Sequence, residues 1–468
     1  MHRGGKYWIV FVLFLIAAEI KAKPNDTLTT AQVESVSLKL YNNKNWKELV
    51  RYTDIVIDKG FDYYFIRMRA GIANYEMEKY RKAELHFKKA LLYNEGDEDA
   101  TSYLYYCLIF DEKYEEARWL SKSFRETLAK KIGTSNSPKL TYANIEGAVK
   151  LSSNHDSIST ANYFEVGLMH YAKNRVSLFH SFSYNSQNEF GNTEVHNDET
   201  VHLLPAYPGA PLPDSIIKLT DTVKSSITIK QYHYYLKANI PLKNNFLFSM
   251  SGQWIYEKDY LKTDDYTINY IQPTTLGPPP VVPPPDTIYA HQVTKNVPGN
   301  SNSIPAVSSF IVSSSLKKSF IYIDCSAGAL ANLNKGHNEY QFSASLEYHP
   351  FANNFFNIGC IGYLHWAQSF GATNSISYSP YLSFVPLKKL SITADYLHNT
   401  KGNVVEYAGY YVNNTPFFIK DKFSLGANYH FNNKLGVYIN YGLENRGSRY
   451  SDFTFTNNLF LIGIAITP

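Results

Sequence analysis

Apolar residues recur with a helical period in the first third of the chain. Between Gln32 and Lys131 their spacing fits one face of an amphipathic helix repeatedly, and no proline interrupts it. The segment also repeats itself, because Trp46, Tyr80 and Tyr114 are equally spaced along it. Self-similarity at a fixed period is typical of stacked helix pairs. The pattern predicts an α-helical domain over residues 23–133, with about three repeats and its most regular copy at residues 64–97.

From Pro138 onward the period of the apolar residues changes to two. Glu339 to His349 and Leu435 to Leu443 alternate strictly between the two faces of an extended strand, and residues 246–256, 423–431 and 460–466 follow the same pattern. Each segment has ~10 to 13 residues, which exceeds the ~5 to 6 of an ordinary soluble strand and suits a tilted strand that crosses a bilayer. A sheet in lipid must close on itself. We therefore expect residues 139–468 to form a transmembrane antiparallel β-barrel.

The connections between the predicted strands differ in length. Six are very short and carry seven lysines and no acid: residues 173–174, 242–245, 317–318, 351–354, 387–389 and 432–434. Two long connections, residues 191–225 and 261–304, hold 12 of the 21 prolines. This asymmetry is typical of outer-membrane barrels, whose short turns are periplasmic and whose long loops are outside. Six short turns predict 14 strands with both ends in the periplasm, or 16 if residues 404–419 form two strands rather than part of a loop.

The first 22 residues have the features of a secretory signal peptide. Arg3 and Lys6 precede an apolar run from Tyr7 to Ala18, and the small residue Ala22 provides a cleavage site. This run is shorter than the ~20 residues that a membrane-spanning helix requires. We expect a mature chain that begins near Lys23, with the helical domain in the periplasm and residues 134–138 as the linker to the barrel.

Composition excludes several classes of protein. Charged residues make up 18% of the 468 residues and the formal net charge is +4, so the chain lacks the basic character of a nucleic-acid-binding protein. Aromatic residues reach 15%, which excludes a disordered chain. Three cysteines cannot provide a disulfide framework. Cys325 and Cys360 fall on lipid-facing positions of strands with one strand between them, too far apart to form a disulfide.

The most regular repeat copy resembles a tetratricopeptide repeat, with small and large residues where two antiparallel helices interlock: Gly71, Ala73, Tyr75, Tyr80, Ala83, Phe87 and Ala90. The whole arrangement resembles the tetratricopeptide-repeat outer-membrane barrels of Gram-negative bacteria, such as the YaiO-type family, and the composition is similar to that of Bacteroidota barrels. Glu95 replaces the closing proline of the motif, and the chain ends in Pro468 rather than an aromatic residue. The resemblance implies a periplasmic docking module and a barrel involved in polysaccharide export.

Polar residues opposite the lipid-facing stripes are candidates for lining the lumen. They are Lys230, His233, Lys237, Glu257, Asp324, Glu347, Asp395, His430 and Glu444, together with Glu146, Lys150, Glu165, Gln253, Asn428 and Asn440. The first three share one predicted strand and form a candidate basic stripe. Side chains fill an eight-stranded barrel, whereas 16 to 18 strands leave an aqueous channel. We expect 14 strands to enclose a lumen that is wide but can be plugged.

Motifs for catalysis and metal binding are missing from the sequence. It contains no nucleophile elbow, no His-Glu-x-x-His and no phosphate-binding glycine loop, so we do not expect an enzyme. The histidines fall singly on different strands, which predicts neither a metal site nor a cofactor. His365 and His430 would meet Asp395 only if their strands were neighbours.

Two functional hypotheses remain. In the first, the barrel passes or receives a polar cargo such as a polysaccharide, and the repeats dock an envelope protein. In the second, the barrel is a non-conducting anchor with a plugged lumen, and its surface loops or repeats bind partners. Under both hypotheses we expect the barrel to contact outer-membrane lipid, and we expect no nucleic acid as a partner.

Overall fold

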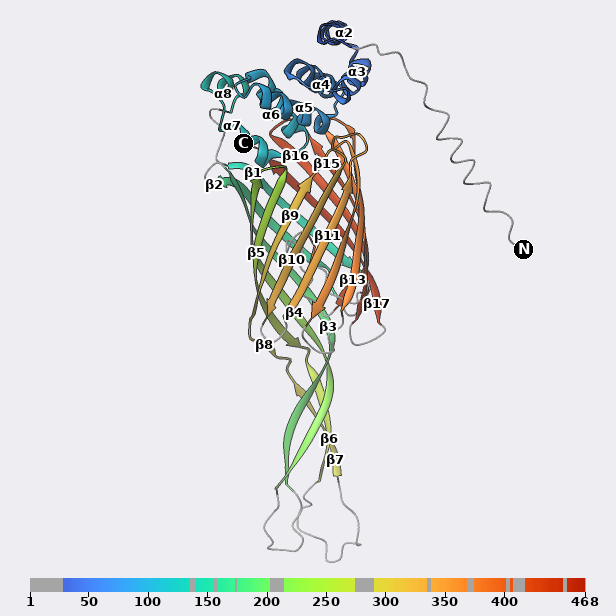
Figure 1. Ribbon diagram of the computed structural model, residues 1–468. Helices are drawn as coiled ribbons and strands as arrows, with labels where there is room; N and C mark the ends of the chain where they lie inside the picture. Colours follow the sequence, from blue (N-terminus) through green and yellow to red (C-terminus); the bar gives the residue numbers. More distant parts are fainter. Residues whose placement is uncertain are drawn as a thin grey trace, which may run out of the picture. The chain divides into compact units, whose positions relative to one another are not determined.

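The computed structural model describes residues 28–134, 140–154, 158–172, 175–202, 214–273, 290–334, 338–367, 374–400, 405–406, 417–448 and 453–467. The predicted signal peptide, residues 1–22, and residues 135–138 of the predicted linker lie outside these ranges. The described chain contains seven helices followed by a closed ring of 14 antiparallel strands (Figure 1). The predicted fold class is therefore confirmed, with 14 strands rather than 16.

The helices begin at regular intervals along the chain. Helices α2 (Thr30–Asn42), α4 (Tyr64–Glu76) and α6 (Glu98–Phe110) start at equal intervals, and α3 (Trp46–Asp58), α5 (Tyr80–Tyr93) and α7 (Tyr114–Ser121) start at the same interval. The last helix, α8 (Glu126–Ile132), ends at Gly133, whose φ of 82° lies in the left-handed region that favours glycine. Helix positions therefore follow the period of the sequence repeat. No helix in the described ranges is both long enough and apolar enough to cross a membrane.

A close contact joins α4 to α5. A Cβ atom at Gly71 would lie 2.7 Å from Cε1 of Phe87, whose side chain is fully buried. Ala73, Ala83 and Ala90 are fully buried as well. Since interiors are close-packed, the Phe87 ring fills the space that the missing side chain of Gly71 leaves. Small and large residues thus interlock here as the repeat pattern predicts.

Contacts divide the chain into two compact units, at a boundary that differs from the predicted one. The first unit comprises residues up to Glu78 together with Lys82–Leu104, and the second comprises Lys79–Arg81 and Tyr105–Pro468. Helices α7 and α8 therefore belong with the barrel, whereas the sequence predicts a boundary at residues 134–138. Polar contacts explain the difference. In α7, Glu115 accepts hydrogen bonds from the Ser177 hydroxyl at 2.8 Å and the Asn239 amide at 3.1 Å.

The ring runs through its strands almost in chain order. They are β1 (Leu140–Ser152), β2 (Ala161–Ala172), β3 (Val176–His202), β4 (Asp214–Leu242), β5 (Phe246–Thr263), β9 (Val307–Ser319), β10 (Ile323–Asn334), β11 (Glu339–Tyr348), β12 (Phe356–Ala367), β13 (Ser375–Leu387), β14 (Leu390–Asn399), β15 (Phe417–His430), β16 (Leu435–Ser448) and β17 (Thr454–Ile466). Strand β17 pairs antiparallel with β1 and so closes the ring. Closure removes the open edges that lipid would not tolerate.

Short turns gather at one end of the ring, which we call the short-turn end. Residues 243–245, 349–355, 388–389 and 431–434 join consecutive strands there, near the predicted positions. Residues 173–174 lie outside the described chain. The turn predicted at Lys317 and Lys318 is wrong, because both lysines belong to β9 and residues 320–322 make the turn. The lysine pair resembles a turn in sequence, but Lys317 reaches a buried carboxylate, that of Asp324, at 2.7 Å.

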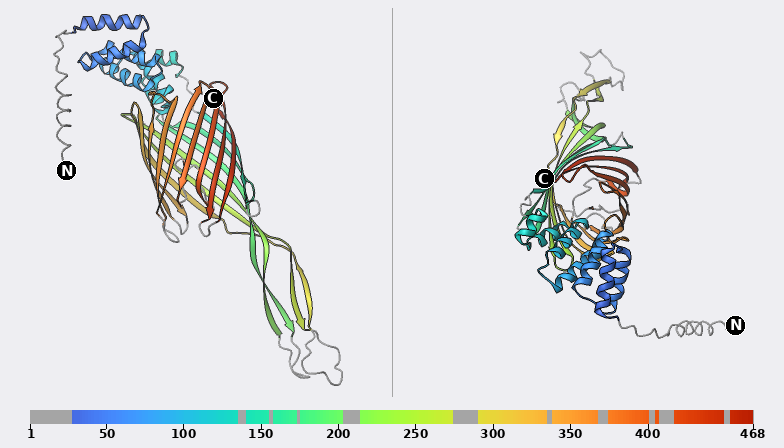
Figure 2. Two further views of the ribbon diagram at one scale, coloured as in Figure 1. Left: turned by 90° about the vertical axis from the view of Figure 1, so that its right-hand side faces the viewer. Right: turned by 90° about the horizontal axis from the view of Figure 1, so that it is seen from above.

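The two long connections contain paired strands. Strands β3 and β4 pair continuously from Ser177–Asn239 to His202–Asp214, well beyond Gly191 and Ser225. Residues 261–304 contain the end of β5, the hairpin of β6 (Tyr266–Pro273) and β7 (Ala290–Val297), and the short strand β8 (Ser301–Ser303). Figures 1 and 2 show these ribbons projecting from the ring, away from the short turns. Neither face of a projecting ribbon requires an apolar stripe, so the sequence gives little sign of the pairing.

The two faces of the ring have opposite character. On the outer face, apolar side chains are exposed, including Ile439 at 54% and Ile462 at 60%. On the inner face, Glu165 and Gln253 are buried, at 1% and 2% exposure. A soluble protein places these residue types the other way round. Strands of at least 10 residues with an apolar exterior and a polar interior identify the ring as a transmembrane barrel.

Candidate functional site: the interior of the barrel

Most of the predicted lumen residues occupy the inner face of the ring. The strand registers pair Glu257 with Gln231, Asp324 with Glu347, and Asp395 with Ser424. The same alternation puts the other predicted positions on that face, with the exception of Lys230: His233, Lys237, His430, Glu444, Glu146, Lys150, Glu165, Gln253, Asn428 and Asn440.

Lys230 lies on the outer face. It pairs with Lys258 of β5, two residues from the pair of Tyr232 with Tyr256, and therefore shares their face. Its Nζ atom is 5.2 Å from the ring centroid of Tyr260. Successive side chains of a strand point to opposite faces, so Lys230 cannot share a face with His233 and Lys237. The predicted basic stripe is therefore wrong at its first member.

Buried charges form a network at the short-turn end of the interior. Arg81 donates to Asp324 Oδ1 and to Asp111 Oδ1, at 2.7 Å in each case. Lys317 Nζ is 2.7 Å from Asp324 Oδ2, and Lys113 Nζ is 2.8 Å from Asp111 Oδ2. The side chains of Arg81, Asp111 and Asp324 are at most 3% exposed, so water screens these charges little. We call these five residues the Arg81 network.

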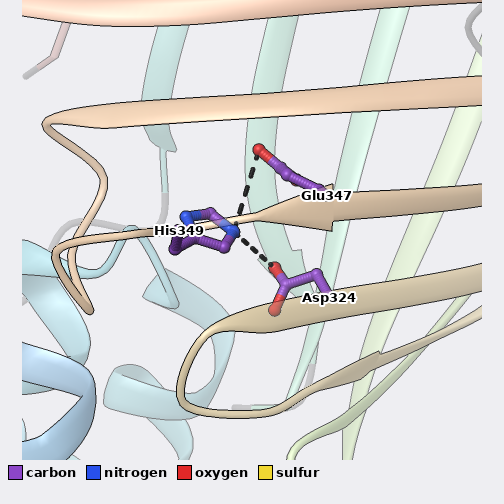
Figure 3. Close-up of side chains that lie close together, drawn as sticks. All are labelled: Asp324, Glu347 and His349. Atoms are coloured by element: carbon purple, nitrogen blue, oxygen red, sulfur yellow. Dashed lines mark ion pairs between the residues drawn. The ribbon is translucent and has the colours of Figure 1, made fainter.

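A polar cavity of about 210 Å³ adjoins the Arg81 network. Asp324 and Glu347 face each other across β10 and β11, and His349 follows Glu347 by two residues. Figure 3 shows that their side chains converge, with His349 Nε2 3.5 Å from Asp324 Oδ2 and 3.9 Å from Glu347 Oε1. Within the described part of the chain, the possible ligand atoms of these three residues lie within 4.8 Å of one another. We call Asp324, Glu347 and His349 the carboxylate–histidine cluster.

Helical residues around the cavity have shifted pKa values. Burial raises the pKa of the Glu112 carboxyl, and the nearby carboxylates of Asp111 and Glu347 raise it further. Burial opposes the charged form of Arg81, but the carboxylates of Asp111 and Asp324 outweigh this effect and raise its pKa. Arg81 is therefore a permanent cation in a region where carboxylates are crowded.

A group of carboxylates and tyrosines lies further along the inner face. Tyr438 donates to Glu146 at 2.6 Å, and Tyr163 donates to Glu146 at 3.1 Å and to Glu165 at 2.7 Å. Tyr438 reaches Glu146 across β17 because that strand has a glycine at the crossing point. A Cβ atom at Gly463 would lie 2.2 Å from the Tyr438 ring. Phenol donors thus satisfy two buried carboxylates on β1 and β2.

Residues Val405 and Glu406 pack inside the ring near the end opposite the short turns. The Gln341 side chain donates to the Val405 carbonyl oxygen at 2.9 Å and accepts from the Val405 N–H at 3.0 Å. Lys422 donates to the Glu406 carboxylate at 2.9 Å. Val405 is 3% exposed and forms an apolar cluster with Ile255, Ile311 and Leu330. These two residues, which we call the luminal segment, occupy part of the interior.

The other candidate residues do not assemble into a catalytic group. Glu444 accepts from Arg446 Nε at 2.9 Å and lies 3.3 Å from Lys150 Nζ. Asp395 lies opposite Ser424, which is six residues along β15 from His430. His365 pairs with Ser375 of β13, whereas Asp395 pairs with Tyr381 of the same strand. These two positions of β13 are six residues apart, so His365 is not beside Asp395. Glu444 is thus paired with two cations, whereas Asp395, His365 and His430 lie at separate positions along the inner face.

Several residues that organise the interior carry no local signal in the sequence. Arg81, Asp111 and Gln341 make contacts with residues at least 30 positions away, which no local pattern reveals. His349 was detectable in principle, because the alternation puts it on the face of Glu347. Its proximity to Asp324 depends on the register of β10 and β11, which the sequence alone does not fix.

Comparisons with known proteins find similarity only among solved structures. No protein-family model matches the chain, and no curated protein matches its sequence. The Ralstonia pickettii toluene transporter TbuX is 7% identical over 70% of this chain and 90% of its own, with a TM-score of 0.40. A bacterial polysaccharide outer membrane secretin is 7% identical over 70% of this chain and 99% of its own, with a TM-score of 0.35. The KdgM porin in complex with disordered oligogalacturonate is 9% identical over 52% of this chain and 98% of its own, with a TM-score of 0.28. TM-scores this low support no inference about function.

Proposed function

We propose that this chain is an outer-membrane channel for a polar cargo, with its helical repeats in the periplasm. One observation carries the proposal, namely that the closed ring has a polar inner face and an apolar outer face. Polar and ionisable side chains inside the membrane are costly, and they typically line the path of a solute. The helices begin at a regular interval, which supports their role as tetratricopeptide-like repeats that dock an envelope protein.

A neutral, hydroxyl-rich cargo such as a polysaccharide fits the inner face best. Hydroxyl groups meet across neighbouring strands there, with Ser251 2.7 Å from Ser313 and Ser326 2.6 Å from Ser345. The described carboxylates Glu146, Glu165 and Glu444 already accept hydrogen bonds from protein groups. Hydroxyls that both donate and accept can exchange partners with a passing sugar, whereas paired charges offer little to an ionic cargo.

The luminal segment favours a second candidate, a barrel that does not conduct and serves as an anchor. Val405 is held by two hydrogen bonds to Gln341 and by apolar contacts, and Glu406 by Lys422. A chain segment fixed inside a lumen reduces its open cross-section. The channel proposal therefore requires that this segment leave its position when cargo passes.

Removal of the Gln341 side chain should separate the two candidates. In planar bilayers, Gln341→Ala is expected to open more often, or to a larger conductance, than the unmodified protein, because Val405 loses both hydrogen bonds to the wall. Ser343→Ala is the matched control, since Ser343 lies two residues along the same strand and also faces inward. A barrel that stays silent in the unmodified protein and in Gln341→Ala would support the anchor instead.

The orientation is open to an independent test. Protease added to intact cells should cut within residues 191–225 or 261–304 and leave residues 32–131 intact, because short turns face the periplasm in outer-membrane barrels. Western blots with antibodies against each end of the chain would identify the fragments, and permeabilised cells serve as the control. Cleavage of residues 32–131 in intact cells would reverse the proposed orientation.

A further inference from the structure

We propose that the carboxylate–histidine cluster, formed by Asp324, Glu347 and His349 at the short-turn end of the barrel, binds a divalent metal ion, with Zn²⁺ as the preferred ion. The proposal does not depend on whether the barrel conducts. The sequence predicts no metal site, because the three residues lie on two strands and at a turn. The hairpin of β10 and β11 brings them together by pairing Asp324 with Glu347.

The spacing of the three side chains suits a small tetrahedral ion. Zinc binds histidine nitrogen and carboxylate oxygen at about 2.0 to 2.2 Å, so neighbouring ligands of a tetrahedron are about 3.4 Å apart. His349 Nε2 is 3.5 Å from Asp324 Oδ2 and 3.9 Å from Glu347 Oε1. Both distances are too long for good hydrogen bonds and within a few tenths of an ångström of the distance between zinc ligands. Figure 3 shows Nε2 directed at both carboxylates.

His349 itself points to a ligand. Its side chain is 2% exposed, and among the described residues the contacts of Nε2 are the two carboxylates at 3.5 and 3.9 Å, both beyond the distance of a good hydrogen bond. A buried polar group without a good hydrogen bond is energetically unfavourable. An ion bound at Nε2 would satisfy this nitrogen, and neutral imidazole is a common ligand of zinc.

The charge around the cavity favours a cation. Its lining includes six carboxylates, from Asp111, Glu112, Glu115, Glu116, Asp324 and Glu347, but only three cationic side chains, from Arg81, Lys113 and Lys317. A divalent ion would reduce this excess of negative charge. A fourth ligand position remains for water, since the cavity of about 210 Å³ has room for several water molecules.

Neighbouring side chains would hold two of the ligands in place. Asn357 donates to Glu347 Oε1 at 2.5 Å, and Arg81 donates to Asp324 Oδ1 at 2.7 Å and to Asp324 Oδ2 at 3.2 Å. Such outer contacts orient metal ligands in known sites. Lys317 competes for Asp324 Oδ2 at 2.7 Å. Its side chain is 41% exposed, so it can turn into solvent when an ion arrives.

The test is calorimetric titration of Zn²⁺ into the purified full-length protein after treatment with a chelator. We expect one equivalent to bind, and we expect Co²⁺ in the same site to give the intense visible absorption of a tetrahedral ion. His349→Ala and Glu347→Gln should each weaken binding by more than about 100-fold, because loss of a group that only orients a ligand costs about 10- to 100-fold. Lys317→Ala should strengthen binding, since it removes the competing cation.

His365→Ala provides the matched control. His365 is also a buried histidine of the inner face, but it lies outside the cluster. Its replacement should leave Zn²⁺ affinity unchanged. Equal Zn²⁺ binding by the unmodified protein and His349→Ala, or no stoichiometric binding by any variant, would overturn the proposal and identify the cluster as part of the ion-pair network alone. A Lys317→Ala protein that folds but gains no affinity would also count against it.

Discussion

Replacement of Ile439 by arginine is expected to block insertion of the barrel or to abolish its heat-stable folded form. Ile439 lies within β16 between Ala427 and Ile462 of the neighbouring strands, and it is 54% exposed on the outer face. A cationic side chain on the lipid face of a barrel costs about 2 to 4 kcal/mol at the bilayer midplane. Heat-modifiable migration in detergent gels, together with the yield in the membrane fraction, would measure the effect.

The adjacent position is the control. Asn440 points inward, between Gly426 and Leu461 of the neighbouring strands, so Asn440→Arg puts the same charge into a polar lumen. We expect normal insertion, and an altered conductance if the barrel is a channel. If both variants insert equally well, β16 is not a membrane strand, and if only Asn440→Arg fails, its register is shifted by one residue.

Removal of the Arg81 guanidinium should cause the largest loss of stability among the polar contacts described. In Arg81→Met, the carboxylates of Asp111 and Asp324 stay buried but lose the guanidinium group that binds both of them. This group donates to both oxygens of Asp324 and to one oxygen of Asp111. Loss of one partner from a buried ion pair typically costs about 3 to 5 kcal/mol, because the remaining charge is uncompensated. Urea unfolding in detergent, followed by the β-sheet circular dichroism signal, would measure the decrease in the free energy of unfolding.

An exposed ion pair in the same compact unit calibrates this result. Lys130 and Glu126 form a pair four residues apart on α8, and both side chains are largely exposed. Lys130→Ala should change the free energy of unfolding by no more than about 0.5 kcal/mol, because solvent screens the pair. An Arg81→Met protein as stable as Lys130→Ala would mean that Lys317 and Lys113 alone neutralise the buried carboxylates.

The barrel was predictable because alternation and turn spacing are local. In β16 and β17, the alternation of the sequence predicts that Ile439 and Ile462 face lipid. The structure pairs these two residues with each other on the outer face. The predicted separation of Cys325 from Cys360 is also confirmed, since Leu346 of β11 pairs with both. Membrane strands carry this information because lipid imposes the same requirement on every second residue.

Other features depend on contacts that a single strand does not encode. Around Lys230, aromatic and polar residues occupy both faces of β4, so nothing in the local pattern distinguishes inside from outside. Arg81 lies 243 residues from Asp324 along the chain, and their contact follows only from the folded arrangement of the second unit. Strand alternation thus predicts Asp324 and Glu347 as inner-face residues, but it does not predict that Arg81 and His349 lie beside them.

The closing pair of strands sets the order in which this barrel can assemble. Ala143 of the first strand, β1, pairs with Ile466 of the last strand, β17, and no other pairing can seal the ring. The length of the chain between these two residues alone contributes about 5 kcal/mol of entropy cost to closure. Until β17 is in place, β1 and β16 each present a row of unsatisfied backbone groups that hydrocarbon does not tolerate. Entry into the bilayer must therefore coincide with closure, or another protein must cover both edges while the last strand arrives.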